Sequence, residues 1–508
     1  MEKFLRNLSF IFFSALVLTS CSKNSDSSTD GEDSGGTASI DSSYTTGTAE
    51  GSTDTGANTS DLVENSVFSS TVSISFGSAV TISNPLEGKG VSVAVDGANV
   101  VVTSTLSEVS YTLSGSTSNG SFKIYSDKKF KLTLNGVSIT NNSGPAINIQ
   151  SSKSAFIELA DNTSNTLADG ATYATAPNDE DMKGTLFSEG QIIFNGNGSL
   201  SVKGNYKHAI CSDDYIRVRS GSITITGAAK DGIHANDAFI ADGGTFNIAA
   251  TSDGIECEEG YIIINSGTFA LNTGDDGITA SYEDGDASIT PYVTINGGSI
   301  QVKSTAGEGI ESKSVLTINK GEISTVTADD GLNAGTAIQI NGGNIYCYST
   351  GNDAMDSNGT FTITGGKIVA IGSKAPEAGI DCDARTLKIT GGMIVAIGGA
   401  TSGPSSSASS VPSVIMGAGQ ASQIIHIEAA DGSEVMTFLA PVSYSTLLYS
   451  SSKLKTNTTY KVYTGGSVSS GTDFNGLYTS GTYTKGTQSG TFTTSGMVTQ
   501  TGGSISRG

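Results

Sequence analysis

A triplet of an acidic residue, glycine and an aliphatic residue recurs along the middle of the chain. Clear copies begin at Asp231, Asp253, Asp276, Glu308 and Asp330, and weaker copies begin at His208, Asp353 and Ala378. Most copies are 22 or 23 residues apart, and an insertion at residues 281–286 extends one interval to 32 residues. Such a period predicts a solenoid, in which equivalent residues of successive coils form columns.

A second column, of glycines, follows the same period. Apolar residues alternate with other residues on both sides of each glycine, as in Ile262 and Ile264 before Gly267 and Phe269 and Leu271 after it. Alternation with period two is typical of strands with one buried face. Three short strands per coil predict an all-β fold, a parallel β-helix of about 22–23 residues per coil over residues 65–400. The glycines are Gly198, Gly221, Gly244, Gly267, Gly298, Gly321, Gly343, Gly366 and Gly392.

The phase of the triplet predicts where its acids point. If the aliphatic residue faces the core, the acid before the glycine and the residue after the aliphatic one face outward. Stacking then produces a ridge of carboxylates along one edge of the helix. The candidate metal ligands in this ridge are Asp231, Asp253, Glu256, Asp275, Asp276, Glu308, Glu311, Asp330, Asp353 and Asp356.

Like charges stacked in this way repel one another. At about 5 Å the repulsion is roughly 0.8 kcal/mol per pair in bulk water, and it is larger near a protein surface. Ca²⁺ offsets such repulsion well, because it accepts a flexible cage of carboxylate and carbonyl oxygens. We therefore expect Ca²⁺ as the cofactor. The alternative is a solvated turn face, because Asp and Asn suit turns. The column of Asn265, Asn296, Asn319 and Asn341 is expected to be a structural ladder of this kind.

The cysteines and histidines carry less information. Cys211, Cys257, Cys347 and Cys382 are expected to be inert core residues, because they fall on or near the inward columns. His208 and His234 are expected to occupy equivalent turn positions on adjacent coils, although a shared site is possible there.

Both ends of the chain differ from the repeats. Residues 1–21 carry Lys3 and Arg6 before a short apolar stretch and end at Cys21, which resembles a bacterial lipoprotein signal with Cys21 as the acylated residue. Residues 22–64 are rich in Ser, Thr, Gly and Asp and predict a disordered tether. After a Ser-rich break, residues 401–508 predict a β-rich cap of the last coil or a small appended β unit.

The predicted location is therefore outside the cytoplasm, with the chain anchored to the bacterial cell envelope. An ordinary secretory signal is the alternative. The net charge of −22 argues against nucleic acid as a partner and against direct contact with anionic membranes, so the lipid is the only expected membrane contact.

Several segments resemble the bacterial carbohydrate-binding β-helix family. They are Lys-Leu-Thr-Leu-Asn-Gly-Val-Ser-Ile at residues 131–139, Gly-Ser-Leu-Ser-Val at 198–202, Gly-Asn-Tyr-Lys-His-Ala-Ile at 204–210, the repeated Asp-Gly-Ile, and Tyr-Thr-Gly-Gly with Gly-Leu-Tyr at 463–478. The resemblance implies a right-handed parallel β-helix similar to pectate lyases. It also implies bound calcium and binding to cellulose-like and acidic polysaccharides such as polygalacturonate. It carries over no individual ligand residue.

Three functions remain open at this point. The first is a non-catalytic, envelope-anchored polysaccharide binder in which Ca²⁺ bridges the protein to sugar carboxylates. The second is a Ca²⁺-dependent polysaccharide lyase, which needs a base beside the metal; Lys230, Lys313 and Arg385 are the candidates. The third is a surface adhesin whose repeats are a spacer. The chain has no Trp, so stacking on neutral glucans would depend on Tyr.

Overall fold

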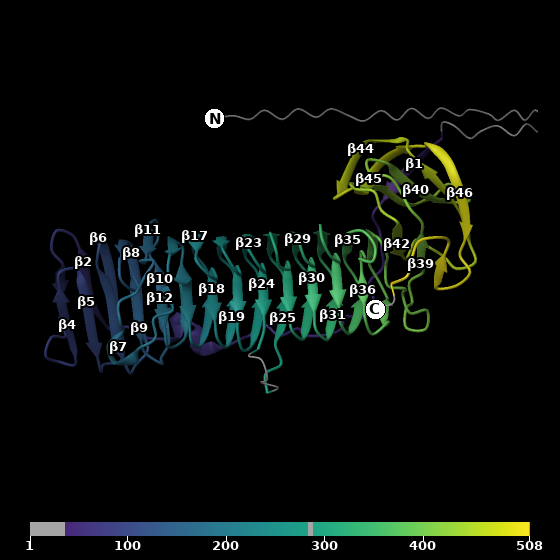
Figure 1. Cartoon of the computed structure of the whole chain (residues 1–508). Helices are drawn as coiled ribbons and strands as arrows, with labels where there is room; N and C mark the ends of the chain where they lie inside the picture. Colours follow the sequence, from purple (N-terminus) through teal and green to yellow (C-terminus); the bar gives the residue numbers. More distant parts are fainter. Residues whose placement is uncertain (1–35, 283–287, 507–508) are drawn as a thin grey trace, which may run out of the picture.

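The protein is a parallel β-solenoid followed by an antiparallel sheet (Figure 1). The computed structural model describes residues 36–282 and 288–506. The solenoid runs from β2 (Ser70–Phe76) to β38 (Met393–Gly398). This confirms the predicted fold class. Among the described residues, no helix has the length and apolar character needed to cross a bilayer.

The recurring triplet lies on one sheet of thirteen strands. In chain order its strands are β4 (Val91–Asp96), β5 (Asn99–Ser104), β7 (Ser121–Ser126), β9 (Ile147–Gln150), β12 (Gly184–Ser188), β15 (His208–Ser212), β18 (Ile233–Ala235), β21 (Ile255–Cys257), β24 (Ile278–Ala280), β27 (Ile310–Ser312), β30 (Leu332–Ala334), β33 (Met355–Ser357) and β36 (Asp381–Cys382). All pairs from β5 onward are parallel, whereas β4 and β5 pair antiparallel at the N-terminal end.

Two further columns of strands complete each coil. In one coil, β21 is followed by β22 (Tyr261–Ile264) and β23 (Thr268–Thr273), and the next coil repeats this order with β24, β25 (Tyr292–Ile295) and β26 (Ser299–Ser304). The registers align the aliphatic residues, with Ile255 opposite Ile278 and Ile262 opposite Val293. These residues are fully buried in one hydrophobic core that extends along the solenoid.

The two glycine columns have different physical causes. Gly244 and Gly267 have φ angles of 92° and 125°, which L side chains rarely adopt, so the corners after the second strands need glycine. Gly254, inside a triplet, has an ordinary φ. A Cβ added there would lie 2.5 Å from the carbonyl oxygen of Gly277 in the next coil. The triplet therefore contains glycine because successive coils approach closely at that point.

The N-terminal segment is part of the fold. Strand β1 (Thr37–Asp41) pairs antiparallel with β45 (Leu477–Thr484). Residues 43–65, which we call the strap, then run along the solenoid and include the 3-10 turns η1 (Thr59–Asp61) and η2 (Val63–Asn65); the strap is the purple segment below the solenoid in Figure 1. The prediction of a disordered tether therefore does not hold for residues 36–64. The rest of that tether and the predicted signal with Cys21 lie outside the described residues.

The predicted Asn ladder holds the strap. Asn296, Asn319 and Asn341 each donate to the Asn of the previous coil, as from Asn319 Nδ2 to Asn296 Oδ1 at 2.8 Å. Asn265, the first of the ladder, donates to Asp242 Oδ1 at 2.9 Å. The same amides also donate to strap carbonyl oxygens, from Asn265, Asn296, Asn319 and Asn341 to Thr55, Asp54, Ser52 and Glu50 at 2.7–2.9 Å. The ladder thus satisfies both the solenoid turns and the backbone of a segment more than 200 residues away in sequence.

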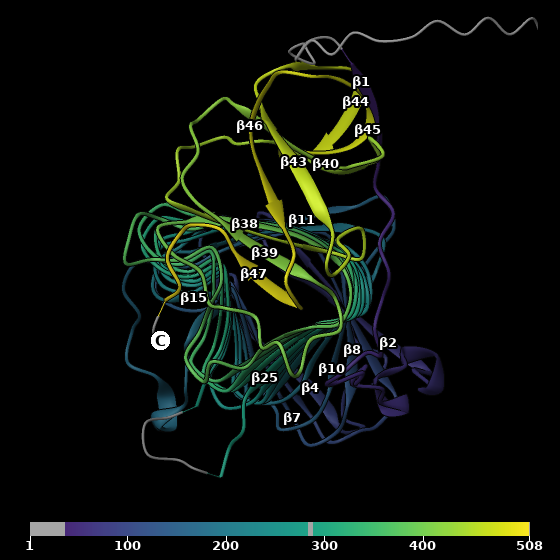
Figure 2. The same ribbon diagram turned by 90° about the vertical axis from the view of Figure 1, so that its right-hand side faces the viewer.

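Residues after the solenoid form both structures that were expected as alternatives. β42 (Thr446–Ser451) pairs antiparallel with β38 and, with β39 (Ser413–Met416) and β47 (Val498–Gln500), caps the last coil. A separate antiparallel sheet contains β40 (Ile424–Ala429), β41 (Glu434–Leu439), β43 (Thr459–Thr464), β44 (Ser467–Phe474), β45, β46 (Thr487–Thr493) and β1. Figure 2 shows this sheet above the end of the stacked coils.

Candidate cation and carbohydrate sites

The column of acids is a buried ladder and not the solvent-facing ridge that was predicted. Asp231, Asp253, Asp276, Asp330 and Asp353 are all less than a tenth exposed. They do point away from the apolar core, but each Oδ1 turns onto the backbone of the next coil. Asp253 Oδ1 accepts from the N–H of Asp276 at 2.8 Å, and Asp276 Oδ1 accepts from Glu308 at 2.8 Å. The acids thus have a structural role at these positions, because their carboxyl oxygens accept backbone N–H groups, as the alternative interpretation of a turn face proposed.

At the N-terminal end of this ladder the acid is paired with histidine and lysine side chains. Asp231 Oδ2 lies 2.9 Å from His208 Nδ1, 3.3 Å from His234 Nδ1 and 3.4 Å from Lys230 Nζ. Burial alone would raise the pKa of Asp231, but these contacts hold it well below its usual range. Burial lowers the pKa of His234, yet Asp231, Glu256 and Glu258 outweigh it and raise that pKa to about 10.

The middle of the ladder brings several carboxyl groups close together. Oxygens of Asp253, Asp275 and Asp276 lie within 4.8 Å of one another. Burial, Glu308 and Glu311 raise the pKa of Asp276 to about 11, and burial with Asp231 and Glu256 raises that of Asp253 to about 7. Glu311 itself is buried and pairs with Thr279 and Lys313. The inserted loop adds three further acids to the sequence near Asp275 and Asp276, namely Glu283, Asp284 and Asp286, and these lie outside the described residues.

A third group of acids closes the C-terminal end of the ladder. Oxygens of Asp353, Asp356 and Asp381 lie within 4.8 Å of one another. Asp356 Oδ1 is buried without a hydrogen-bond partner, and burial with Asp381 raises the pKa of Asp356 to about 6. Asp330, in the preceding coil, is an additional acid beside this group. Burial together with Asp356 and Asp353 raises its pKa to about 9. Asp381 is a member of this group that the list of candidate ligands omitted.

The middle and C-terminal groups fit a hard divalent cation. Both consist only of carboxylates, and burial beside other acids raises the pKa of Asp253 and Asp276 in the first group and of Asp353 and Asp356 in the second. The orphaned Asp356 Oδ1 is an oxygen that a cation would satisfy. Such oxygen-only donor sets suit Ca²⁺. The N-terminal end of the ladder differs in its donor set, because Asp231 there already contacts His208 and Lys230.

Arg385, Lys230 and Lys313 were the candidate lyase bases. Lys230 lies 3.4 Å from Asp231 and 3.6 Å from Glu256, and Lys313 pairs with Glu311. Burial lowers the pKa of each lysine, but the neighbouring carboxylates outweigh it and the net shift is upward. Both lysines are therefore protonated at neutral pH. Arg385 is exposed and lies far from Lys230 and Lys313 in the sequence. It lines a hollow together with residues of the C-terminal segments.

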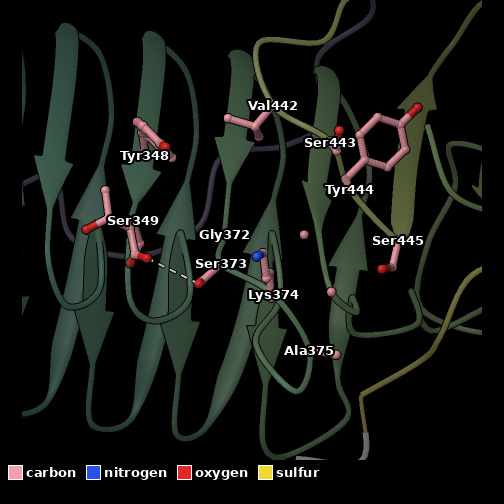
Figure 3. Close-up of a pocket in the computed structure, with 13 residues that line it drawn as sticks. Tyr348, Ser349, Gly372, Ser373, Lys374, Ala375, Val442, Ser443, Tyr444 and Ser445 are labelled. Carbon is pink, nitrogen blue, oxygen red and sulfur yellow. Dashed lines mark hydrogen bonds between the residues drawn. The ribbon is translucent and has the colours of Figure 1, made fainter. Parts of the chain in front are cut away.

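Three adjoining hollows form a groove between the last coils and the C-terminal segments. The first, of about 480 Å³, is lined by Tyr348, Ser373, Lys374 and Tyr444 (Figure 3). Ala375 links it to a second hollow of about 420 Å³, which is lined by Glu377, Asp381 and Ser506. Ser506 and Ile505 link that to a third, of about 480 Å³, lined by Arg385 and Ser402. Sequence reasoning missed this groove, because it is assembled from segments that do not repeat.

The lining of the groove combines aromatic rings with hydroxyl groups. Tyr348 and Tyr444 supply aromatic rings in the first hollow, and hydroxyl groups of Ser373, Ser402 and Ser506 are distributed along it. Hydrogen-bonding groups with aromatic walls are typical of sites for polar ligands. The middle hollow includes Asp381, so the groove passes directly beside the C-terminal carboxylate group.

Cys211, Cys257, Cys347 and Cys382 are all buried, as expected, but they separate into two classes. Cys257, Cys347 and Cys382 belong to the apolar core of the solenoid. Cys211 is buried but lies outside that core, in register with His234. His208 and His234 are therefore not at equivalent positions, although their rings stack with centroids 4.1 Å apart.

The fold places the chain among the parallel β-solenoid proteins. A family model described as carbohydrate-binding domain-containing protein matches residues 96–375, which is more than half of the chain. The chain belongs to this family, as the sequence motifs indicated.

Two known proteins are similar to parts of this chain. A carbohydrate-binding domain-containing protein of Acetivibrio thermocellus is 33% identical over 114 residues, 22% of this chain and 40% of that protein. The chain therefore spans less than half the length of this relative. The solved structure of a polysaccharide lyase-like protein from C. thermocellum, a gadolinium derivative, aligns with a TM-score of 0.42 and 24% identity, over 53% of this chain and 96% of that chain.

Proposed function

We propose that the protein is a non-catalytic polysaccharide-binding protein whose groove holds several consecutive sugar units of an acidic, pectin-like or cellulosic glycan. The observation that carries this proposal is the continuity of the three hollows, which share Ala375 and Ser506 along their length. Separate pockets would suit a small ligand, whereas adjoining ones suit an extended chain.

The proposed role of Ca²⁺ follows from the charge of the groove. A protein of net charge −22 repels a polyanion, so an acidic glycan needs cations where it touches the protein. Lys374 and Arg385 lie in the outer hollows, and the group of Asp353, Asp356 and Asp381 borders the middle one. A Ca²⁺ ion held by this group would accept a sugar carboxylate as a further ligand.

Non-catalytic binding agrees with the state of the candidate bases. A lyase base must be able to accept the proton at carbon beside the sugar carboxyl group. Lys230 and Lys313 have raised pKa values and are occupied by carboxylates. Arg385 lines the groove and keeps the lyase alternative testable.

Binding should be measured on immobilised polygalacturonate and on cellulose, with Ca²⁺ and with EDTA. We expect binding to polygalacturonate to require Ca²⁺, and binding to cellulose to depend on it less. Tyr348→Ala and Asp356→Asn should weaken binding, whereas Tyr282→Ala, at an exposed site outside the groove, should not. Polygalacturonate binding that is equal with Ca²⁺ and with EDTA would contradict the bridging role.

The same samples test the two other functions. Ultraviolet absorbance of unsaturated products, lost in Arg385→Ala, Lys230→Ala or Lys313→Ala, would identify a lyase. Absence of binding to either polysaccharide would leave the adhesin or spacer role.

We also propose that the protein is exported and held at the cell envelope by a lipid on Cys21. This proposal rests on the signal-like residues 1–21. Metabolic labelling with a radioactive fatty acid should mark the full chain and not Cys21→Ala. Release of the unlabelled wild-type protein into the medium would favour an ordinary secretory signal.

A further inference from the structure

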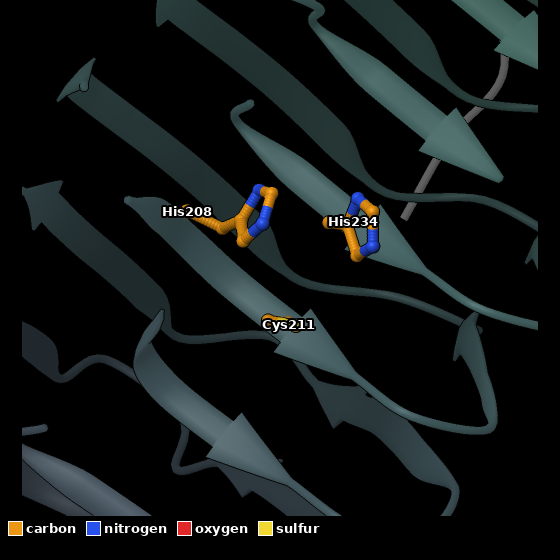
Figure 4. A group of neighbouring side chains, drawn as sticks. All are labelled: His208, Cys211 and His234. Atoms are coloured by element: carbon orange, nitrogen blue, oxygen red, sulfur yellow. The ribbon is translucent and has the colours of Figure 1, made fainter. Parts of the chain in front are cut away.

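The N-terminal end of the acid ladder carries softer ligands than the rest. Position 208 is His where the following coils have an acid, and the outward residues of β15 and β18 are Cys211 and His234. Donor atoms of His208, Cys211 and His234 all lie within 4.8 Å of one another. Figure 4 shows the two imidazole rings side by side with Cys211 next to them.

His208 is an independent sign that a ligand is missing. Its side chain is fully buried, and Nδ1 lies 2.9 Å from Asp231 Oδ2. The other ring nitrogen, Nε2, has no hydrogen-bond partner. A buried polar atom without a partner costs about 1–3 kcal/mol, so proteins rarely retain one without a reason.

We propose that His208, Cys211 and His234, with Asp231 as a fourth ligand, bind one transition-metal cation of the Zn²⁺ class. Two imidazoles, a thiolate and a carboxylate are a donor set that such a cation prefers and that Ca²⁺ does not. Tetrahedral Zn²⁺ with bonds of about 2.0–2.3 Å places its ligand atoms roughly 3.4–3.7 Å apart. The donor atoms of His208, Cys211 and His234 lie within 4.8 Å of one another, so they need to approach one another by about 1 Å or less to reach that spacing.

The surroundings supply the support that such a site needs. His234 Nδ1 lies 2.9 Å from Glu256 Oε2 and its Nε2 lies 3.2 Å from Glu258 Oε2. One nitrogen can bind the metal while the other keeps a carboxylate, an arrangement that orients metal-bound histidines. Glu258, whose side chain is 43% exposed, marks the solvent side by which an ion enters. Binding releases the proton of the Cys211 thiol and one proton of His234 to solvent.

This inference is independent of the proposed function and of Ca²⁺. The site shares the ladder with the carboxylate groups but none of the residues of the middle and C-terminal groups. The chain thus keeps its nitrogen and sulfur ligands at one end of a column and its oxygen-only groups further along.

The test is titration of the metal-free full chain with ZnCl₂ and CoCl₂, followed by calorimetry and absorption spectroscopy. We expect one equivalent to bind with Ca²⁺ present in excess, and Co²⁺ to give the visible bands of a tetrahedral site with a thiolate-to-metal charge-transfer band. Cys211→Ser should abolish the charge-transfer band, and His208→Gln should weaken Zn²⁺ binding on the order of tenfold or more.

Matched variants make the result decisive. Cys257→Ser changes a core cysteine and should leave the charge-transfer band in place, and Asp356→Asn should leave Zn²⁺ affinity unchanged. Circular dichroism checks that each variant is folded; if His208→Gln does not fold, the loss of the charge-transfer band in Cys211→Ser decides alone. Failure of the wild type to bind Zn²⁺, equal affinity in His208→Gln, or a Co²⁺ spectrum unaffected by Cys211→Ser would overturn the proposal.

Discussion

The carboxylate of Asp253 accepts the backbone N–H of Asp276, its counterpart in the next coil, at 2.8 Å. Each acid of the ladder is thus a backbone acceptor as well as a charge. These two roles can be separated by substitution, because asparagine keeps the acceptor oxygen and removes the charge.

At position 276 the two roles give opposite expectations. The pKa of Asp276 is raised to about 11, so the carboxyl group is protonated at pH 7 without metal and resembles an amide. Asp276→Asn should therefore be nearly neutral to stability, whereas Asp276→Ala should cost about 1–3 kcal/mol because the N–H of Glu308 loses its acceptor. Urea unfolding in EDTA at pH 7 measures both. Equal losses in the two variants would contradict the acceptor role.

Without metal, stability should fall as the pH rises from 7 to 9. The folded-state pKa values of Asp330, Asp276 and His234 are raised to about 9, 11 and 10, above their unfolded values. The folded state then binds more protons than the unfolded state, so the stability these groups contribute is lost as the pH rises. The slope is on the order of 1 kcal/mol per pH unit for each proton. Asp330→Asn should flatten the dependence measured by urea unfolding, and a rise in stability over this range would refute the assignment.

Ca²⁺ should raise the melting temperature, because it binds the folded ladder and not the unfolded chain. At a concentration one hundred times Kd the gain is about 2.7 kcal/mol. Asp356→Asn with Asp381→Asn should reduce this gain, while Asp237→Asn, an exposed acid outside the carboxylate groups, serves as control. Differential scanning calorimetry with Ca²⁺ and with EDTA makes the comparison. If chelation leaves the wild-type melting temperature unchanged, the ladder binds no Ca²⁺.

Two neighbouring arginines should differ in their contribution to the strap. Arg217 is buried and bonds to Asp242, to Asp61 and to the carbonyl oxygen of Gly56. Arg217→Leu leaves Asp61 buried beside an apolar group, which should cost about 3–5 kcal/mol and expose the strap to protease. Arg219→Ala removes only a solvent-exposed pair with Glu64 and should have little effect. Limited proteolysis followed by mass spectrometry detects cleavage near residue 56. Equal protection in both variants would show that the strap is held elsewhere.

The repeat made most of the solenoid predictable. Alternation around Gly267 located the strands β22 and β23, and the phase of the triplet identified Ile255 and Ile278 as core residues. These predictions succeed because they depend on local spacing, which stacking repeats unchanged from coil to coil.

The burial of the acids was not predictable in the same way. An outward direction from the core was correct for His234, but the residues that cover it, Glu256 and Glu258, come from the next coil and differ from coil to coil. The register of Cys211 with His234 follows from aligning the triplet at His208 with the triplet at Asp231. The expectation that His208 and His234 are equivalent did not follow this alignment.

The strap was missed for a related reason. Its residues lack an alternating apolar pattern, and its bonds to the Asn ladder use main-chain carbonyl oxygens such as those of Ser52 and Asp54. Every residue has such an oxygen, so the composition of the strap does not reveal that it can bind the Asn ladder. The composition alone therefore indicates a flexible segment.

The pairing of β1 with β45 has a consequence for how the molecule is made. Strand β1 is separated by more than 400 residues from its partner at residues 477–484. The coils can stack locally, because each pairs its strands with those of its neighbours. Strand β1 has no partner until β45 has formed, so the first described strand docks only after a distant part of the chain has folded. Folding of the molecule therefore does not follow the order of its sequence.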